Sequence, residues 1–107
     1  MLEKKYYAYR IEPIRLAMLT EGPTPEEAEI VSKHFNYLRL LTDRGDAIFV
    51  GRTLTTDERT FGITVFQAVS EETAREIMNN DPAVSNGVMR AELFPFKIVM
   101  MNAPQAV

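Results

Sequence analysis

The chain has no cysteine and a single histidine, His34, among its 107 residues. Without cysteine it can form no disulfide, no thiol nucleophile and no thiolate metal site, and a cytoplasmic location fits this composition best. No glycine-rich phosphate-binding motif and no His-Glu-x-x-His run occurs either. The sequence therefore predicts no metal site and no cofactor.

Strong charge and long apolar runs are missing as well. The net charge is −3 with a pI near 5.2, and the basic residues are scattered, so nucleic acid is not an expected partner. No window approaches the roughly 18 apolar residues of a membrane span, so we expect no membrane association. Hydrophobic residues at 46% and charged residues at 25% are ordinary for a folded protein. They predict one domain over 1–107, with a core at about 5–101 and a tail at 102–107.

The clearest signal that is present predicts a helix between Pro23 and Gly45. Thr24 is placed to cap this helix, Pro25 suits its first position, and Glu27 completes a capping box. Gly45 offers a left-handed stop at the other end. Between them, side chains recur at three- and four-residue steps along one face: Ile30, Val31, His34, Leu38 and Leu41. The pattern predicts an amphipathic helix that carries the histidine on its apolar face.

The rest of the chain predicts four strands, a second helix and a helical turn. Apolar alternation and apolar runs indicate strands at Lys5–Pro13, Ala47–Val50, Phe61–Val69 and Val88–Met101. The second of these is expected to be covered on both faces, and Pro95 interrupts the last. A helix follows Ser70 and ends before Pro82, and Asp81 caps a further turn through Ser85. The segments between elements are Ile14–Gly22, an irregular candidate flap, and Thr53–Thr60, a hairpin connection.

This order of elements predicts an α+β, ferredoxin-like βαββαβ protomer, with an antiparallel four-stranded sheet and two helices on one face. The other face of the sheet would be bare, although three strand segments carry apolar side chains in both directions: Ala47–Val50, Phe61–Phe66 and Ile98–Met101. Such a face is too large to leave in contact with water. We therefore expect a homodimer in which two sheets pack face to face.

His34 is the main candidate for chemistry. An imidazole on an apolar face has to satisfy two ring nitrogens, and beside a carboxylate it can accept and return a proton near neutral pH. Asp81 is the best-placed carboxylate, because it lies at the end of the second helix rather than on a solvated face. No Gly-x-Ser-x-Gly elbow occurs, so a serine nucleophile is poorly supported. We expect His34 and Asp81 within hydrogen-bonding distance, in a concave site between the two helices and the sheet.

Several of these residues together resemble the YciI-like (YCII-related) family over about Ile30 to Val99. The resemblance rests on an ordered set: His34, Leu38, Leu41, Arg44-Gly45-Asp46, Val50-Gly51, Gly62, Val69-Ser70-Glu71-Glu72, Asp81-Pro82-Ala83-Val84 with Gly87, and Pro95-Phe96. It implies a dimeric α/β barrel with His34 and Asp81 as an active-site pair. A few members eliminate chloride from chlorinated muconolactones, and most have no assigned reaction. The chain departs from the family pattern at Arg52, where proline is common, and in its longer Ile14–Pro23 segment. Because both departures border the expected pocket, the resemblance does not carry a substrate over.

Two interpretations stay open. In the first, the protein is a small enzyme of the lyase, isomerase or dehydrochlorinase type, in which His34 transfers a proton on a small molecule, an anionic one being favoured. Asp81 would hold the imidazole, and the candidates for substrate binding are Arg52, Tyr7 and Tyr9. In the second, it is a non-catalytic small-molecule-binding or accessory module whose His–Asp pair only ties two helices together. Each candidate also has a structural explanation: a core histidine, a helix-capping aspartate, a solvated arginine and core tyrosines.

Overall fold

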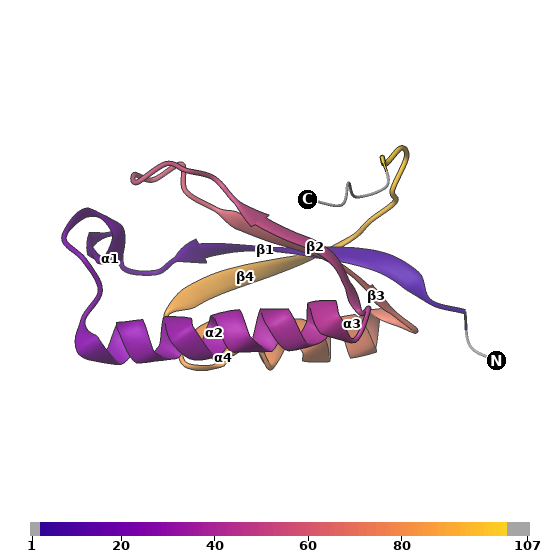
Figure 1. Cartoon of the computed structure of the whole chain (residues 1–107), viewed down its shortest axis with the longest axis horizontal. Helices are drawn as coiled ribbons and strands as arrows, with labels where there is room; N and C mark the ends of the chain where they lie inside the picture. The colour runs from indigo at the N-terminus through magenta and orange to yellow at the C-terminus, as the bar shows by residue number, and fades with distance from the viewer. Residues whose placement is uncertain (1–2, 103–107) are drawn as a thin grey trace.

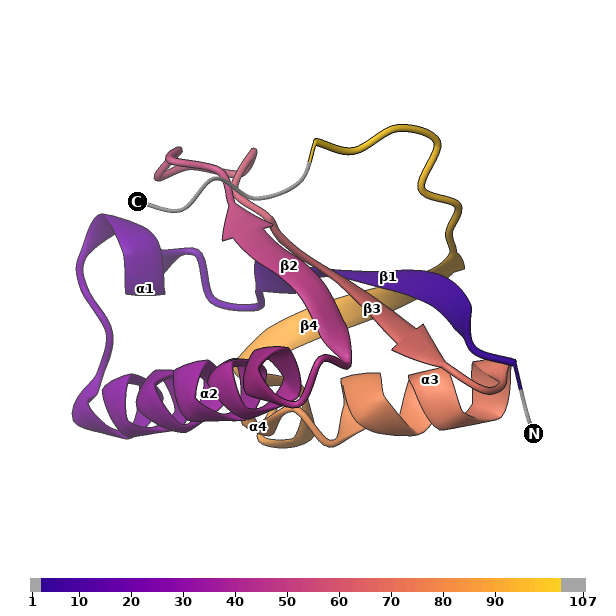
Figure 2. The ribbon, with the colours of Figure 1, turned by 45° about the vertical axis from the view of Figure 1, so that its right-hand side comes forward.

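The chain forms one antiparallel sheet with helices against one of its faces (Figures 1 and 2). The computed structural model describes residues 3–102. The elements are, in order, β1 (Lys5–Pro13), α1 (Ala17–Thr20), α2 (Pro25–Asp43), β2 (Ala47–Arg52), β3 (Gly62–Ala68), α3 (Glu71–Asn79), α4 (Pro82–Ser85) and β4 (Met89–Pro95). Across the sheet the strand order is β2-β3-β1-β4, and all neighbours are antiparallel. The predicted α+β, ferredoxin-like arrangement is confirmed.

The central strand β1 decides which side chains enter the core. Successive side chains of a strand point to opposite faces, and Tyr7, Tyr9 and Ile11 are buried on the face that the helices cover. The core continues into neighbouring elements with Leu38, Leu41, Phe66, Ala74 and Met78. Residues at the middle of β1 are therefore fixed by strands on both sides and by helices below.

The long helix α2 begins and ends where its sequence predicts. The Thr24 hydroxyl accepts the Glu27 backbone N–H at 3.1 Å, and the Glu27 carboxylate accepts the Thr24 backbone N–H at 2.9 Å, which is a complete capping box. Pro25 occupies the first turn, and Gly45 beyond the end has a φ of +82°. Helices α2 and α3 lie side by side beneath the sheet (Figure 2).

The predicted last strand is too long. β4 ends at Pro95, whereas the sequence pattern extends it to Met101. Proline has no N–H to give to a strand ladder. Among the described residues after it, only Phe96 bonds back to β1, where its N–H donates to the carbonyl oxygen of Tyr6 at 3.1 Å. The chain beyond β4 then leaves the sheet on its helix-free side (Figure 1). Of the predicted tail at 102–107, residues 103–107 lie outside the described residues.

Two further expectations need correction. Strand β2 lies at an edge of the sheet and is not covered on both faces, since Phe49 and Val50 are 50% and 40% exposed. The candidate flap at Ile14–Gly22 contains one helical turn, α1, which buries Met18. Among the helices of residues 3–102, none has both the length and the apolar character required to cross a membrane.

Candidate active site

His34 and Asp81 meet beneath the sheet, one from α2 and the other from the start of α4. The Asp81 carboxylate caps α4 by accepting the Ala83 backbone N–H at 2.9 Å, and Pro82 begins the helix. The same carboxylate faces His34, whose Nδ1 lies 2.7 Å from Oδ1 and 2.8 Å from Oδ2. His34 is 5% exposed and Asp81 is fully buried. The expected contact between the two side chains is present.

A third side chain, Tyr9, completes the group. Its hydroxyl donates to Asp81 Oδ2 at 2.8 Å, and its ring packs edge-on against Phe66 with 5.6 Å between ring centroids. Burial, and then the neighbouring Asp81 carboxylate, raise the pKa of Tyr9 far above its ordinary value. The hydroxyl therefore stays protonated and acts as a donor. Tyr9 joins the centre of β1 to the carboxylate across 72 positions of sequence.

These contacts define the state of the imidazole. A carboxylate only accepts hydrogen bonds, so Nδ1 of His34 carries the proton and donates it to Asp81. The other ring nitrogen, Nε2, makes no hydrogen bond to any residue of 3–102. Every buried side-chain nitrogen or oxygen in that range has a hydrogen-bond partner, so Nε2 is not one of the buried atoms. Nε2 is therefore accessible to solvent and offers a lone pair. A histidine that a carboxylate holds in this tautomer is able to act as a general base.

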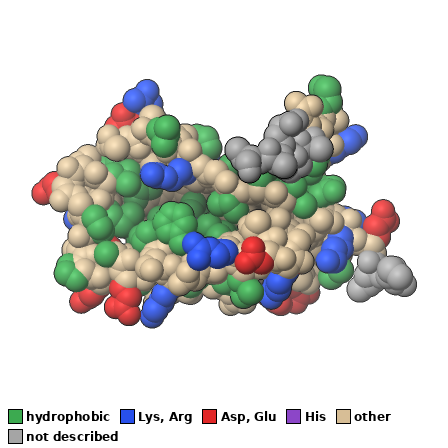
Figure 3. All heavy atoms as spheres, in the orientation of Figure 1, with side chains coloured by type: hydrophobic (Ala, Val, Ile, Leu, Met, Phe, Trp, Pro, Cys, Tyr) green, Lys and Arg blue, Asp and Glu red, His purple; other side chains and the backbone are tan. Residues whose placement is uncertain are grey.

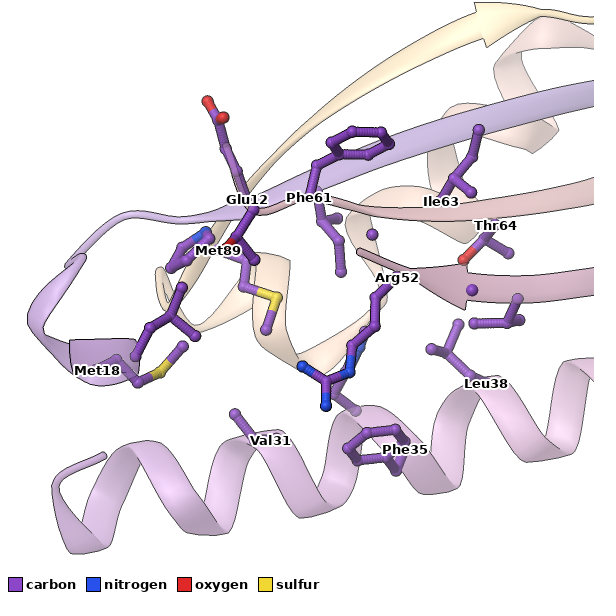
Figure 4. Close-up of a pocket in the computed structure, with 18 of the residues that line it drawn as sticks. Glu12, Met18, Val31, Phe35, Leu38, Arg52, Phe61, Ile63, Thr64 and Met89 are labelled. Atoms are coloured by element: carbon purple, nitrogen blue, oxygen red, sulfur yellow. The ribbon is translucent and has the colours of Figure 1, made fainter. Parts of the chain in front are cut away.

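A cavity of about 560 Å³ lies on the open side of His34. It is bounded by α2, by the 14–23 segment and by the neighbouring ends of β1, β2 and β3 (Figure 4). Its lining is mostly apolar, with side chains that include Met18, Val31, Phe35, Leu38 and Met89. Polar lining residues include His34, Arg52, Thr60 and Thr64. From the side of Figure 1, hydrophobic side chains gather above α2 next to α1 (Figure 3). Helix α3 contributes no residue to this lining, so the site lies between one helix and the sheet rather than between two helices and the sheet.

The absence of a side chain at Gly62 helps to keep this space open. Gly62 stands opposite Ile11 on β1 and lines the cavity. A Cβ atom at Gly62 would lie 3.2 Å from Ile11 Cγ1, which is closer than ordinary packing. The edge position of β2 leaves the cavity open on its other side.

The structure brings only some of the predicted site residues to the cavity. His34 and Arg52 line it, and Asp81 stands behind His34. Tyr7 and Tyr9 belong to the core cluster instead and do not line the cavity. Sequence reasoning did not find the contact between Tyr9 and Asp81, although a tyrosine on the buried face of a central strand requires a polar partner.

The sequence reasoning also missed Phe35, which lines the cavity. It is an aromatic residue directly after the histidine, on the exposed side of α2, and its ring centroid lies 5.7 Å from that of His34.

Within residues 3–102 no cluster of three or more histidine, aspartate or glutamate side chains is arranged to hold a metal ion.

Comparisons with known proteins agree with the fold. The sequence model of the YCII-related domain matches residues 11–97. Among solved structures, the chain is similar to 5-chloro-2-hydroxyhydroquinone dehydrochlorinase (TftG) from Burkholderia phenoliruptrix AC1100, in complex with 2,5-dihydroxybenzoquinone. The TM-score is 0.61 at 19% identity, over 85% of this chain and 93% of that one. It is also similar to the uncharacterized protein TM1266 from Thermotoga maritima, with a TM-score of 0.54 at 13% identity, over 89% of this chain and 100% of that one. At these identities the likeness concerns the fold. No match was found among curated proteins.

Proposed function

The chain belongs to the YCII-related family, and from that membership we propose that it is a small acid–base enzyme. In this proposal His34 takes a proton from a small molecule bound in the cavity. It then returns the proton to another atom of that molecule or passes it to water. Asp81 orients the imidazole and stabilises the imidazolium that forms.

One observation carries the proposal. The ring of His34 is bonded on one side only: Nδ1 donates to a fully buried carboxylate, while Nε2 stays accessible beside a cavity. A histidine that served the core alone would be expected to have both nitrogens bonded to protein groups or to ordered water. Here one nitrogen is anchored and the other is available for proton transfer.

Lyase or isomerase chemistry suits a site whose available base is Nε2 of His34. In an elimination from an sp3 carbon, Nε2 accepts a proton, the electrons of the broken O–H or C–H bond form a new double bond, and chloride leaves with the electrons of the C–Cl bond. In a chlorinated hydroxyarene, the ring carbon that bears chlorine first gains a proton by keto–enol tautomerisation, and chloride then leaves from that sp3 carbon. In an isomerisation, the same proton returns at another carbon. The similarity in fold to TftG, a dehydrochlorinase by name, supports including chlorinated hydroxyarenes among the candidate substrates.

Proton transfer can be tested without knowing the net reaction. The purified protein is incubated in D₂O with a panel of small lactones, carboxylates and chlorinated hydroxyarenes, and deuterium uptake and chloride release are measured by mass spectrometry and ion chromatography. We expect turnover of at least one class, and a loss of about 100-fold or more in His34→Gln. Circular dichroism establishes that the variant is folded. Asp81→Asn should also lose activity, because an amide can donate to Nδ1 and so favour the wrong tautomer.

The alternative is a binding module without turnover. It is favoured by the fact that Asp81 caps α4 and joins it to α2, which is a sufficient structural role. Ligand binding without deuterium uptake or chloride release across the whole panel would support this alternative and contradict the enzyme proposal. Turnover that is equal in wild type and His34→Gln would contradict the role of His34 as the base.

A further inference from the structure

We infer that the cavity binds a small anion with an apolar ring, and that Arg52 holds its negative group. This inference rests on the proposed function only in using the same cavity as the binding site. The register of the sheet places Arg52 opposite Gly62, which in turn stands opposite Ile11. Cross-strand partners point to the same face, and Ile11 is buried on the helix side. The Arg52 side chain therefore leaves β2 toward α2, on the side of Val31 and Phe35 (Figure 4).

Arg52 has no ion-pair partner within the described part of the chain. Five other arginines each have a carboxylate partner: Arg15, Arg44, Arg59, Arg75 and Arg90. The one acidic residue in the lining, Glu12, is already paired, because its Oε1 lies 2.7 Å from Nε of Arg90. Figure 4 shows the Glu12 carboxylate directed away from the cavity. The protein therefore supplies a guanidinium at the cavity mouth without supplying its counter-ion.

The surroundings of Arg52 select the rest of the ligand. A guanidinium presents a planar fork of N–H donors that matches two adjacent oxygens, as in a carboxylate. Next to it the lining is apolar, with Val31, Phe35 and Leu38 on α2. A cavity of about 560 Å³ is ample for a single ring with one acidic group. The ligand class that fits is a ring-bearing carboxylate, or an anion with two adjacent oxygens, whose reactive hydrogen faces His34.

Benzoate and benzamide are suitable probes, because they share a ring and differ in charge. Binding of each to the wild type, Arg52→Gln, Arg52→Lys and Arg39→Gln is measured by isothermal titration calorimetry at low salt. Arg39 is the matched control, because it is exposed on α2, does not line the cavity and has no ion pair within residues 3–102. We expect the wild type and Arg39→Gln to bind benzoate about tenfold or more tightly than benzamide. This preference should vanish in Arg52→Gln and be reduced in Arg52→Lys, which keeps the charge but loses the fork.

Three outcomes would overturn the inference: equal affinities of the wild type for acid and amide, no benzoate binding at millimolar concentration, or an unchanged preference in Arg52→Gln. His34→Gln separates this test from that of the proposed function. If Arg52 is the anchor, His34→Gln keeps the preference for benzoate even though it cannot transfer a proton. If the protein prefers benzoate but shows no turnover, the anion site is supported and the enzyme proposal is contradicted.

Discussion

Asp81 serves three partners with one carboxylate. It caps α4 through Ala83, accepts the hydroxyl of Tyr9, and faces Nδ1 of His34. The structural and the functional explanations of this residue are therefore not exclusive, since the cap is what fixes the carboxylate where the imidazole needs it. Tyr9 fixes it from the other side and is best described as a positioning residue.

Removing the Tyr9 hydroxyl should destabilise the fold measurably. We expect Tyr9→Phe to lower the free energy of unfolding by about 1.5–3 kcal/mol at pH 7, because a buried carboxylate loses one of its donors. The measurement is urea unfolding followed by circular dichroism. The matched control is Tyr6→Phe on the opposite face of β1, where the side chain is partly exposed, and it should stay within about 0.5 kcal/mol of wild type. A loss in Tyr9→Phe no larger than in Tyr6→Phe would contradict this role.

The same residue predicts a dependence on alkaline pH. Burial raises the pKa of Tyr9 above its ordinary value of 10.0, so the folded state keeps the proton that the unfolded chain releases. Its contribution to stability is complete below pH 10 and is lost as pH rises above that value. We expect the difference in stability between wild type and Tyr9→Phe to shrink as pH rises from 10 to about 11.

At the scale of elements, the 14–23 segment is attached to α2 by Glu27. The carboxylate of Glu27 accepts hydrogen bonds from the Arg15 guanidinium, with Nε at 2.9 Å, while it also completes the capping box with Thr24. One side chain thus closes the start of α2 and holds the segment whose Met18 lines the cavity. The Arg15 bonds, followed by the Thr24 N–H, lower the pKa of Glu27 from 4.5 to about 2.

This attachment should weaken in acid. Because the folded-state pKa of Glu27 is depressed, its stabilising contribution is present above about pH 4.5 and is lost as pH falls toward 2. Arg15→Gln should therefore have a lower melting temperature than wild type at pH 7, and the difference should narrow between pH 4.5 and about pH 2. Arg39→Gln removes the same charge from α2 without an ion pair and serves as the control. A difference that does not change with pH would show that Arg15 acts through packing alone.

The helices and strands differ in how well the sequence predicts them. The bounds of α2 and α3 follow from Thr24 and Ser70, since capping is a local interaction that the sequence displays directly. The exposure of β2 and the early end of β4 depend on which strands become neighbours, and a strand pattern does not state that. The His34–Asp81 contact could be expected, because both residues are candidates by their positions in the sequence and both belong to the family resemblance. The Tyr9–Asp81 contact could not, because nothing local in the sequence relates two residues 72 positions apart.

The whole molecule leaves an apolar row on the helix-free face of its sheet. Ala8 on β1 stands opposite Val65 on β3 and Phe94 on β4, and Val65 stands opposite Phe49 on β2. The two central members are buried within the protomer, whereas Phe49 and Phe94 at the ends are 50% and 40% exposed. The bare face is therefore less extensive than the sequence alone suggests, but it still presents Phe49 and Phe94 to water.

Charged pairs border this row in a pattern that can pair with itself. Arg10 stands opposite Glu92, and Glu12 stands opposite Arg90 in neighbouring positions of β1 and β4. A twofold axis through such a face can bring a basic residue of one protomer near an acidic residue of the other. This pattern and the exposed aromatic ends together support the homodimer that we propose, with the helices outside and the two sheets packed together.

The dimer should be broken by a charge at the end of the apolar row. Multi-angle light scattering at micromolar concentration should give twice the 12.2 kDa of one chain for the wild type. Phe94→Glu should give the monomer mass, because packing a second sheet over it would bury an unpaired carboxylate. Leu40→Glu places the same change on an exposed position of α2, away from the sheet, and should remain dimeric. A wild type that is monomeric under these conditions would refute the homodimer and leave the aromatic ends of the row in contact with water. A dimer that survives Phe94→Glu but not Leu40→Glu would place the interface on the helices, where it would border the cavity instead of lying across the sheet from it.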